Sequence, residues 1–203
     1  MLCCMDETLL PLIAFAAAMS FTPGPNVVMV TASAANHGFR RAIPHMLGVT
    51  FGFGVMVMIV GAGLGGLLLV DPRFHAALKW TGAAYILYLA WRIANGAAVS
   101  REATVAKPIG FVEAALFQWV NVKGWIFAVG ALASFTTAGG NIWIETAVVS
   151  TVLVTACLAS VVLWAALGAR IGRALRSARA RLAFNWSMAT LLLASLVPVL
   201  HVA

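Results

Sequence analysis

The segment Thr22-Pro23-Gly24-Pro25-Asn26 combines two prolines, a glycine and an amide side chain inside an apolar run from about Leu9 to Ala35. Each proline removes a backbone donor and clashes with the carbonyl four residues earlier, so a helix entering at Leu9 must kink or break here. Irregular backbone at membrane depth is tolerated where it lines a polar cavity, and broken helices of this kind form the substrate sites of secondary transporters. We therefore predict a transport site at these five residues. The alternative is a structural kink, since proline and glycine are common in membrane helices.

A second set of polar residues, Gln118, Asn121 and Lys123, lies in another apolar stretch. A lysine at the centre of a membrane helix costs roughly 2.5 to 3.5 kcal/mol, so we expect Lys123 to face the bundle interior or water and to have a partner. Glu113, at the start of the same stretch, is the first candidate for proton coupling, and transport that does not depend on pH would exclude this role. The alternative is that Glu113 is a solvated residue at the membrane interface.

The two sets are predicted to lie at similar depth. Asn26 is nine residues from the end of its stretch at Ala35, and Asn121 is eight from the start of its stretch at Glu113. At about 1.5 Å per residue, both lie roughly 12 to 13 Å inside the membrane. A helix that restarts at Pro25 would direct free N–H groups and a positive dipole end into the site, which suits a carboxylate. Together with Lys123 and the two asparagines, this favours a small zwitterionic or carboxylate-bearing solute such as an amino acid.

The composition is that of an integral membrane protein. Hydrophobic residues make up 63% of the 203 residues and charged residues only 9%, against roughly 25% charged residues in soluble domains. We predict a single membrane domain over 1–203, with a first three-helix half at about 1–95, a cytoplasmic loop at about 96–110 and a second half at about 111–203. The chain contains no phosphate-binding loop of the GxxxxGK[ST] type, no CxxC pair and no spaced histidines typical of a metal site. These absences favour a secondary transporter without cofactor or metal over an enzyme.

Six stretches are long and apolar enough to cross a bilayer, which needs about 20 such residues. Their approximate limits are Leu9–Ala35, Ile43–Val70, His75–Ile93, Glu113–Phe135, Glu145–Gly168 and Ala183–Val202. The predicted fold is therefore an all-α bundle of six membrane helices, with the first helix broken at Pro23-Gly24-Pro25. Because each half contains three spans, the halves enter the membrane in opposite directions, as two inverted three-helix repeats would.

The basic residues predict the orientation of the bundle. Placing the N-terminus outside puts ten of the 13 Lys and Arg residues in cytoplasmic loops: Arg40, Arg41, Arg92, Arg101, Lys107, Arg170, Arg173, Arg176, Arg179 and Arg181. Both termini are then external. The net charge of +7 thus comes from loop residues that would contact anionic membrane lipids, so nucleic acid is not expected as a partner.

The second stretch is rich in glycine, and Gly48 and Gly52 are spaced to let helix backbones approach closely. The simplest interpretation is tight packing against the broken first helix. An internal interface and a homodimer would use such glycines equally well.

The Thr22–Asn26 motif, followed by Gly38, Arg41 and the Gly48/Gly52 spacing, resembles the amino-acid exporters of the LysE/RhtB family. Further similarities are Tyr85-Ile-Leu-Tyr-Leu89 before a basic loop, Gly110-Phe111, and Asn121 with Lys123. The resemblance implies a six-helix secondary exporter of amino acids or their derivatives in a bacterial inner membrane, driven by protons or by the membrane potential. The family usually has proline between the asparagine and the lysine, where this chain has Val122, and this departure predicts that the fourth span is less broken than in relatives.

Two other classes of protein stay open. A membrane-embedded redox or metal-handling protein would need paired cysteines or clustered histidines and carboxylates within the spans. A membrane subunit that transports nothing itself would give the double proline and Lys123 no evident use.

Overall fold

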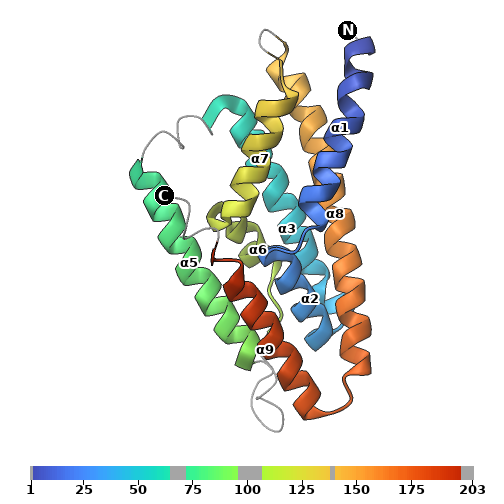
Figure 1. Ribbon diagram of the computed structural model, residues 1–203, viewed down its shortest axis with the longest axis vertical. Coiled ribbons are helices and arrows are strands. Elements are labelled where there is room, and N and C mark those ends of the chain that lie inside the picture. Colours follow the sequence, from blue (N-terminus) through green and yellow to red (C-terminus); the bar gives the residue numbers. More distant parts are fainter. Residues whose placement is uncertain (1, 65–71, 96–106, 138–139, 198–203) are drawn as a thin grey trace.

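The computed structural model describes residues 2–64, 72–95, 107–137 and 140–197, and in these ranges the regular structure is helical, with no strand. The helices lie roughly along one long axis (Figure 1). The all-α prediction is thereby confirmed. The predicted span ends at Val70 and Val202, and most of the 96–110 loop, lie outside the described residues.

The described elements are these, in chain order: α1 Leu2–Phe21, α2 Pro25–His37, α3 Phe39–Ile59, a π-helical turn η1 Val60–Leu64, α5 Pro72–Asn95, α6 Phe111–Phe117, a 3₁₀ turn η2 Gln118–Val120, α7 Val122–Phe135, α8 Ile142–Ala174 and α9 Ala178–Ala194.

The first apolar stretch is broken as predicted. Helix α1 ends at Phe21, α2 begins at Pro25, and the two helices are bent by 54°. Pro25 occupies the first turn of α2, where its missing N–H costs little and its fixed φ suits the helix. The double proline therefore ends one helix and starts the next.

The fourth apolar stretch is broken more sharply, by 68°, between the segments Phe111–Val120 and Val122–Phe135. The expectation that Val122 leaves this span less broken than in relatives stays a prediction, but the break itself is present without a proline. The chain tightens into the 3₁₀ turn η2 and becomes extended at Asn121 (φ −86°, ψ 95°). The Asn121 carbonyl then accepts the N–H groups of Gly124 at 2.9 Å and Trp125 at 3.3 Å. This local network makes the break without a proline.

Two hydrophobic clusters lie on either side of the breaks. One joins α2, α3, α5, α6 and α9, with contributions from α8, and includes the buried residues Met29, Leu89 and Phe117. The other joins α1, α3, α7 and α8 around Phe53 and Phe127. Each broken pair thus contributes one helix to each cluster, so both breaks fall between the two cores.

The glycines of α3 pack against α6, and not against the broken first helix as predicted. A Cβ added at Gly48 would overlap the carbonyl of Phe111, and one added at Gly52 would lie 2.7 Å from the Cα atom of Ala115. Close approach of the α3 and α6 backbones requires a residue without a side chain at both positions. These glycines therefore serve an internal interface. The broken first span is instead packed closely by glycines of α8, where Gly168 and Gly172 contact Thr31 and Ala35 of α2.

Two stretches of helix, Phe39–Gly63 and Ile142–Ala174, are long and apolar enough to cross a membrane, and counting each bent pair as one span raises the number to four among the described residues. The structure thus agrees with a membrane protein. The six-span prediction would also need α5 and α9, and over the described residues neither helix meets this criterion.

The α3–α6 contact generates a prediction about stability. Replacing Gly48 with Ala should destabilise the protein by about 1 to 3 kcal/mol, because the new methyl group would lie 2.8 Å from the Cβ of Ala114 and closer still to the Phe111 carbonyl. Gly130→Ala is the matched control, since its Cβ would meet only Phe15, at 3.8 Å. Thermal unfolding of the purified protein in detergent measures both changes, and equal midpoints for the two variants would contradict the prediction.

Candidate functional site

The break between α1 and α2 brings the end of one helix and the start of another to the same place. Gly24 precedes α2 in an extended conformation (φ −159°, ψ −179°). A Cβ at Gly24 would lie 2.8 Å from Cδ of Lys123, so the absence of a side chain lets the lysine pass across the break. The first N–H groups of α2, including those of Asn26 and Val27, lack acceptors within the helix.

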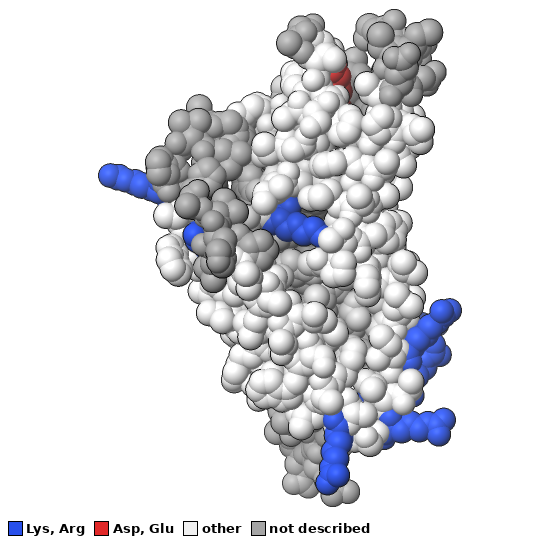
Figure 2. All heavy atoms as spheres, viewed as in Figure 1, with Lys and Arg blue, Asp and Glu red and all other residues white. Residues whose placement is uncertain are grey.

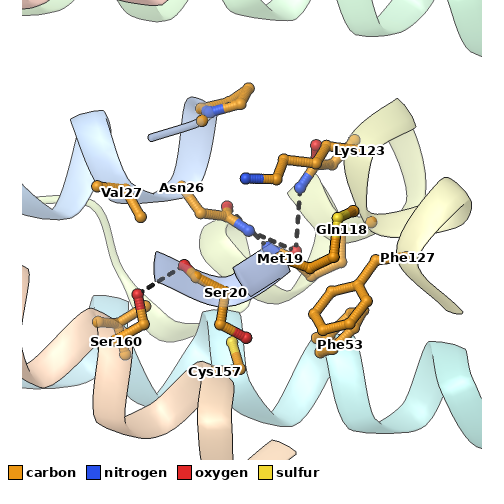
Figure 3. Close-up of a pocket in the computed structure, with 15 residues that line it drawn as sticks. Met19, Ser20, Asn26, Val27, Phe53, Gln118, Lys123, Phe127, Cys157 and Ser160 are labelled. Atoms are coloured by element: carbon orange, nitrogen blue, oxygen red, sulfur yellow. Dashed lines mark hydrogen bonds between the residues drawn. The ribbon is translucent and has the colours of Figure 1, made fainter. Parts of the chain in front are cut away.

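Asn26 and Gln118 connect the two breaks directly. Nδ2 of Asn26 donates to Oε1 of Gln118 at 2.9 Å, and Nε2 of Gln118 donates back to Oδ1 of Asn26 at 3.2 Å. Gln118 is fully buried, and its Nε2 also donates to the Ala114 carbonyl at 2.9 Å. This reciprocal pair brings the two polar sets into direct contact (Figure 3), while their depth in the membrane stays a prediction.

Lys123 spans the gap in the other direction. Its Nζ donates to the Thr22 carbonyl at 2.7 Å, and its side chain extends from α7 toward α2 (Figure 3). The carbonyls at the end of α1 carry partial negative charge and lack helical partners, so a cation is favourable there. The polar partner that we expected for Lys123 is therefore the Thr22 carbonyl, which has no helical hydrogen bond because the double proline ends the helix. Thr22 contributes this carbonyl, while its hydroxyl donates to Ala18 at 2.5 Å.

A second carbonyl at the end of α1 is satisfied by a residue that the sequence analysis did not select. Oγ of Ser160 in α8 donates to the Ser20 carbonyl at 2.7 Å. A serine in the middle of a long apolar helix is the signal that could have identified it. Ser20, another serine in an apolar helix, was also not predicted as a site residue. Its own hydroxyl is buried without a partner among the described residues.

These groups surround a small cavity of about 50 Å³. Its polar wall is formed by Ser20, Asn26, Gln118, Asn121, Lys123 and Ser160, and its apolar wall by Met19, Phe53, Phe127 and Cys157, among others. Asn121 is 3% exposed, and its Oδ1 has no hydrogen-bond partner in the part of the chain that the structure describes. A buried acceptor without a donor is costly. The cavity therefore offers an ammonium, amides, helix N-termini and unsatisfied oxygens to one small ligand.

The remaining predicted residues lie elsewhere. Pro23 lines a neighbouring, larger cavity, and Gly48 and Gly52 pack against α6. Glu113 is ion-paired with Arg92 at 2.5 Å and accepts the Tyr85 hydroxyl at 3.2 Å, and it does not line the cavity at the breaks. The role of Glu113 in proton coupling stays a prediction. A proton taken up by Glu113 would have to disrupt its ion pair with Arg92.

The described residues include no group of three or more His, Cys, Asp or Glu side chains placed to hold a metal ion.

Comparisons with known proteins identify a family for this chain. A family model described as LysE type translocator matches residues 17–199. Over 117 residues the chain is 41% identical to a protein of Salmonella choleraesuis (strain SC-B67) and 40% identical to one of Escherichia coli (strain K12), both named cysteine/O-acetylserine efflux protein. The alignments cover 57% of this chain and 59% of each relative, so the chain spans less than two thirds of these relatives. No solved structure matches the chain.

The Asn26–Gln118 pair can be tested by a double-mutant cycle. Asn26→Ala and Gln118→Ala should each lower stability, because each leaves a half-buried or buried amide without its partner. The double variant should lose less than the sum of the two, by about 0.5 to 3 kcal/mol. Thermal unfolding of the four purified proteins measures the coupling, and strict additivity would show that the two amides do not stabilise each other.

Proposed function

The chain belongs to the LysE type translocator family, and we propose that it exports an amino acid or a close amino-acid derivative across a bacterial inner membrane by secondary transport. The names of the relatives, cysteine/O-acetylserine efflux protein, support this solute class. The observation that carries the proposal is a pair of contacts between the two helix breaks at a small polar cavity: Lys123 with the Thr22 carbonyl, and Asn26 with Gln118. Neither the family match nor the relatives favour a redox or metal-handling protein, or a subunit without transport.

The proposed recognition follows from the partial charges at the site. The solute's carboxylate would lie near the Lys123 ammonium and the N-termini of α2 and α7, where N–H groups and positive dipole ends favour an anion. Its ammonium would lie near the unpartnered oxygens of Asn121 and Ser20. A zwitterion satisfies both, whereas a simple anion would leave the buried acceptors without donors.

The proposed transport step is an exchange of partners by Lys123. Without solute, the ammonium holds the Thr22 carbonyl at the end of α1. A bound carboxylate would compete for the ammonium and weaken the link between α7 and α1. Because α1 and α7 pack in the same hydrophobic cluster, loosening this link would let these two helices separate within that cluster and open the site to one side of the membrane.

We further propose six spans, formed by α1 with α2, α3, α5, α6 with α7, α8 and α9, in one membrane domain of two halves, with both termini outside. Basic atoms gather at the end of the molecule where α8 meets α9, and the opposite end, where α1 begins, carries few (Figure 2). This asymmetry supports a cytoplasmic position for the α8–α9 turn.

Replacing Asn26 with Ala or Lys123 with Met should abolish amino-acid efflux while leaving protein abundance in the membrane intact, because each removes one contact between the breaks and a group that would face the solute. Lys79→Met is the matched control, since Lys79 lies on α5 and lines neither cavity at the breaks. Efflux of radiolabelled amino acids from loaded cells measures the effect. Unchanged efflux in both site variants would remove these residues from the mechanism.

Cysteine labelling tests the orientation. In a background in which Cys3, Cys4 and Cys157 are serine, Ile142→Cys at the start of α8 should react with a membrane-impermeant maleimide on intact cells. Ala178→Cys at the start of α9 should react only after permeabilisation. Neither residue caps its helix, since Asn141 and Ser177 do so. The reverse pattern of labelling would invert the proposed orientation.

A further inference from the structure

A second cavity of about 250 Å³ lies beside the candidate site and shares part of its wall. Five residues line both cavities: Met19, Gly24, Pro25, Asn121 and Lys123. The rest of the larger cavity is lined mainly by apolar residues from α5, from α7 and from the turn that follows α9, such as Ala83, Ile86, Val122, Ile126 and Leu196. We refer to it as the side-chain pocket.

The helix α5 forms the far wall of this pocket and is held tightly against the second break. A Cβ at Gly82 would overlap the Val120 carbonyl, so the α5 backbone touches the chain just before Asn121. Ala83 and Ile86, which follow on α5, are buried and line the pocket. The pocket is thus bounded by both breaks and by a closely packed helix.

We propose that the side-chain pocket receives the side chain of the exported amino acid, so that the protein prefers apolar side chains about the size of leucine or methionine to those of alanine, serine or cysteine. This inference rests on the proposed function. An engineered apolar cavity of about 150 Å³ already takes up benzene, so a volume of about 250 Å³ has room for such a side chain.

The residues shared by the two cavities favour an amino acid as the occupant of the side-chain pocket. Lys123 and Asn121 face both cavities, so a solute with its charged groups at the breaks would have its side chain directed into the pocket. The buried Oδ1 of Asn121 has no donor among the described residues, and the ammonium of an amino acid supplies one. A lipid acyl chain would fill the apolar part but bring nothing to either polar group. Small ligand sites commonly combine an apolar lining with a few polar groups in this way.

Two substitutions change the pocket in opposite directions. Ala83→Leu adds methyl groups at its wall and should reduce the preference for leucine and methionine over alanine and cysteine by at least about 10-fold, the lower end of what one methylene achieves in an apolar pocket. Ile86→Ala enlarges the pocket and should improve transport of phenylalanine relative to leucine. Ala84→Leu, on the exposed neighbouring position of α5, is the control and should change neither ratio.

The experiment is counterflow of labelled amino acids into liposomes containing the purified full-length protein, with unlabelled alanine, serine, cysteine, leucine, methionine and phenylalanine as competitors. A preference for leucine and methionine that decreases in Ala83→Leu and shifts toward phenylalanine in Ile86→Ala supports the proposal. Equal ratios in the parent and in both pocket variants overturn it and leave a lipid chain as the occupant. A uniform loss for every solute in both variants also overturns it, because the pocket then acts only on structure.

The same assay separates this inference from the function on which it rests. Transport of amino acids without any size preference overturns the side-chain pocket and leaves amino-acid export standing. Absence of transport for every amino acid by the unaltered protein overturns the proposed function and this inference together.

Discussion

The interruption of two apolar helices between two hydrophobic clusters is the constraint on which the rest of the structure depends. Each break leaves carbonyls at the end of one helix and N–H groups at the start of the next, and a membrane supplies no water to satisfy them. The chain satisfies the carbonyls with its own side chains: Lys123 bonds to Thr22, and Ser160 bonds to Ser20. Asn26 and Lys123, in the first turns of α2 and α7, line the same small cavity and form a shared polar layer.

Under the proposed function, the position of this layer would link solute recognition to helix movement. The helices α2 and α6 pack in one cluster and α1 and α7 in the other. The pair Asn26–Gln118 therefore joins the two broken spans beside the first cluster, and the pair Lys123–Thr22 joins them beside the second. Polar pairs of this kind can exchange a protein partner for a solute at small net cost, because a hydrogen bond is replaced rather than lost. Packed hydrophobic clusters cannot deform continuously, which favours movement of whole units about the layer.

Local sequence was sufficient where one residue type has one physical consequence. Pro23 and Pro25 break the first helix wherever it packs, and Lys123 in an apolar stretch needs a polar partner. Proline chemistry says nothing of the break in the fourth stretch, which forms at Asn121 through a 3₁₀ turn and backbone bonds that involve no proline. The sequence prediction was wrong about the partner of Gly48 and Gly52, since a glycine spacing permits close packing but does not say which helix approaches.

The sequence by itself therefore determined the all-helical class, the first break and the family resemblance, since composition and proline chemistry act locally. Only the tertiary structure decided that Gln118 pairs with Asn26, that Lys123 bonds to the Thr22 carbonyl, and that an apolar pocket of about 250 Å³ adjoins the site. These contacts join residues roughly a hundred positions apart. They depend on how α3, α5 and α8 pack around the broken pairs, which no local pattern encodes.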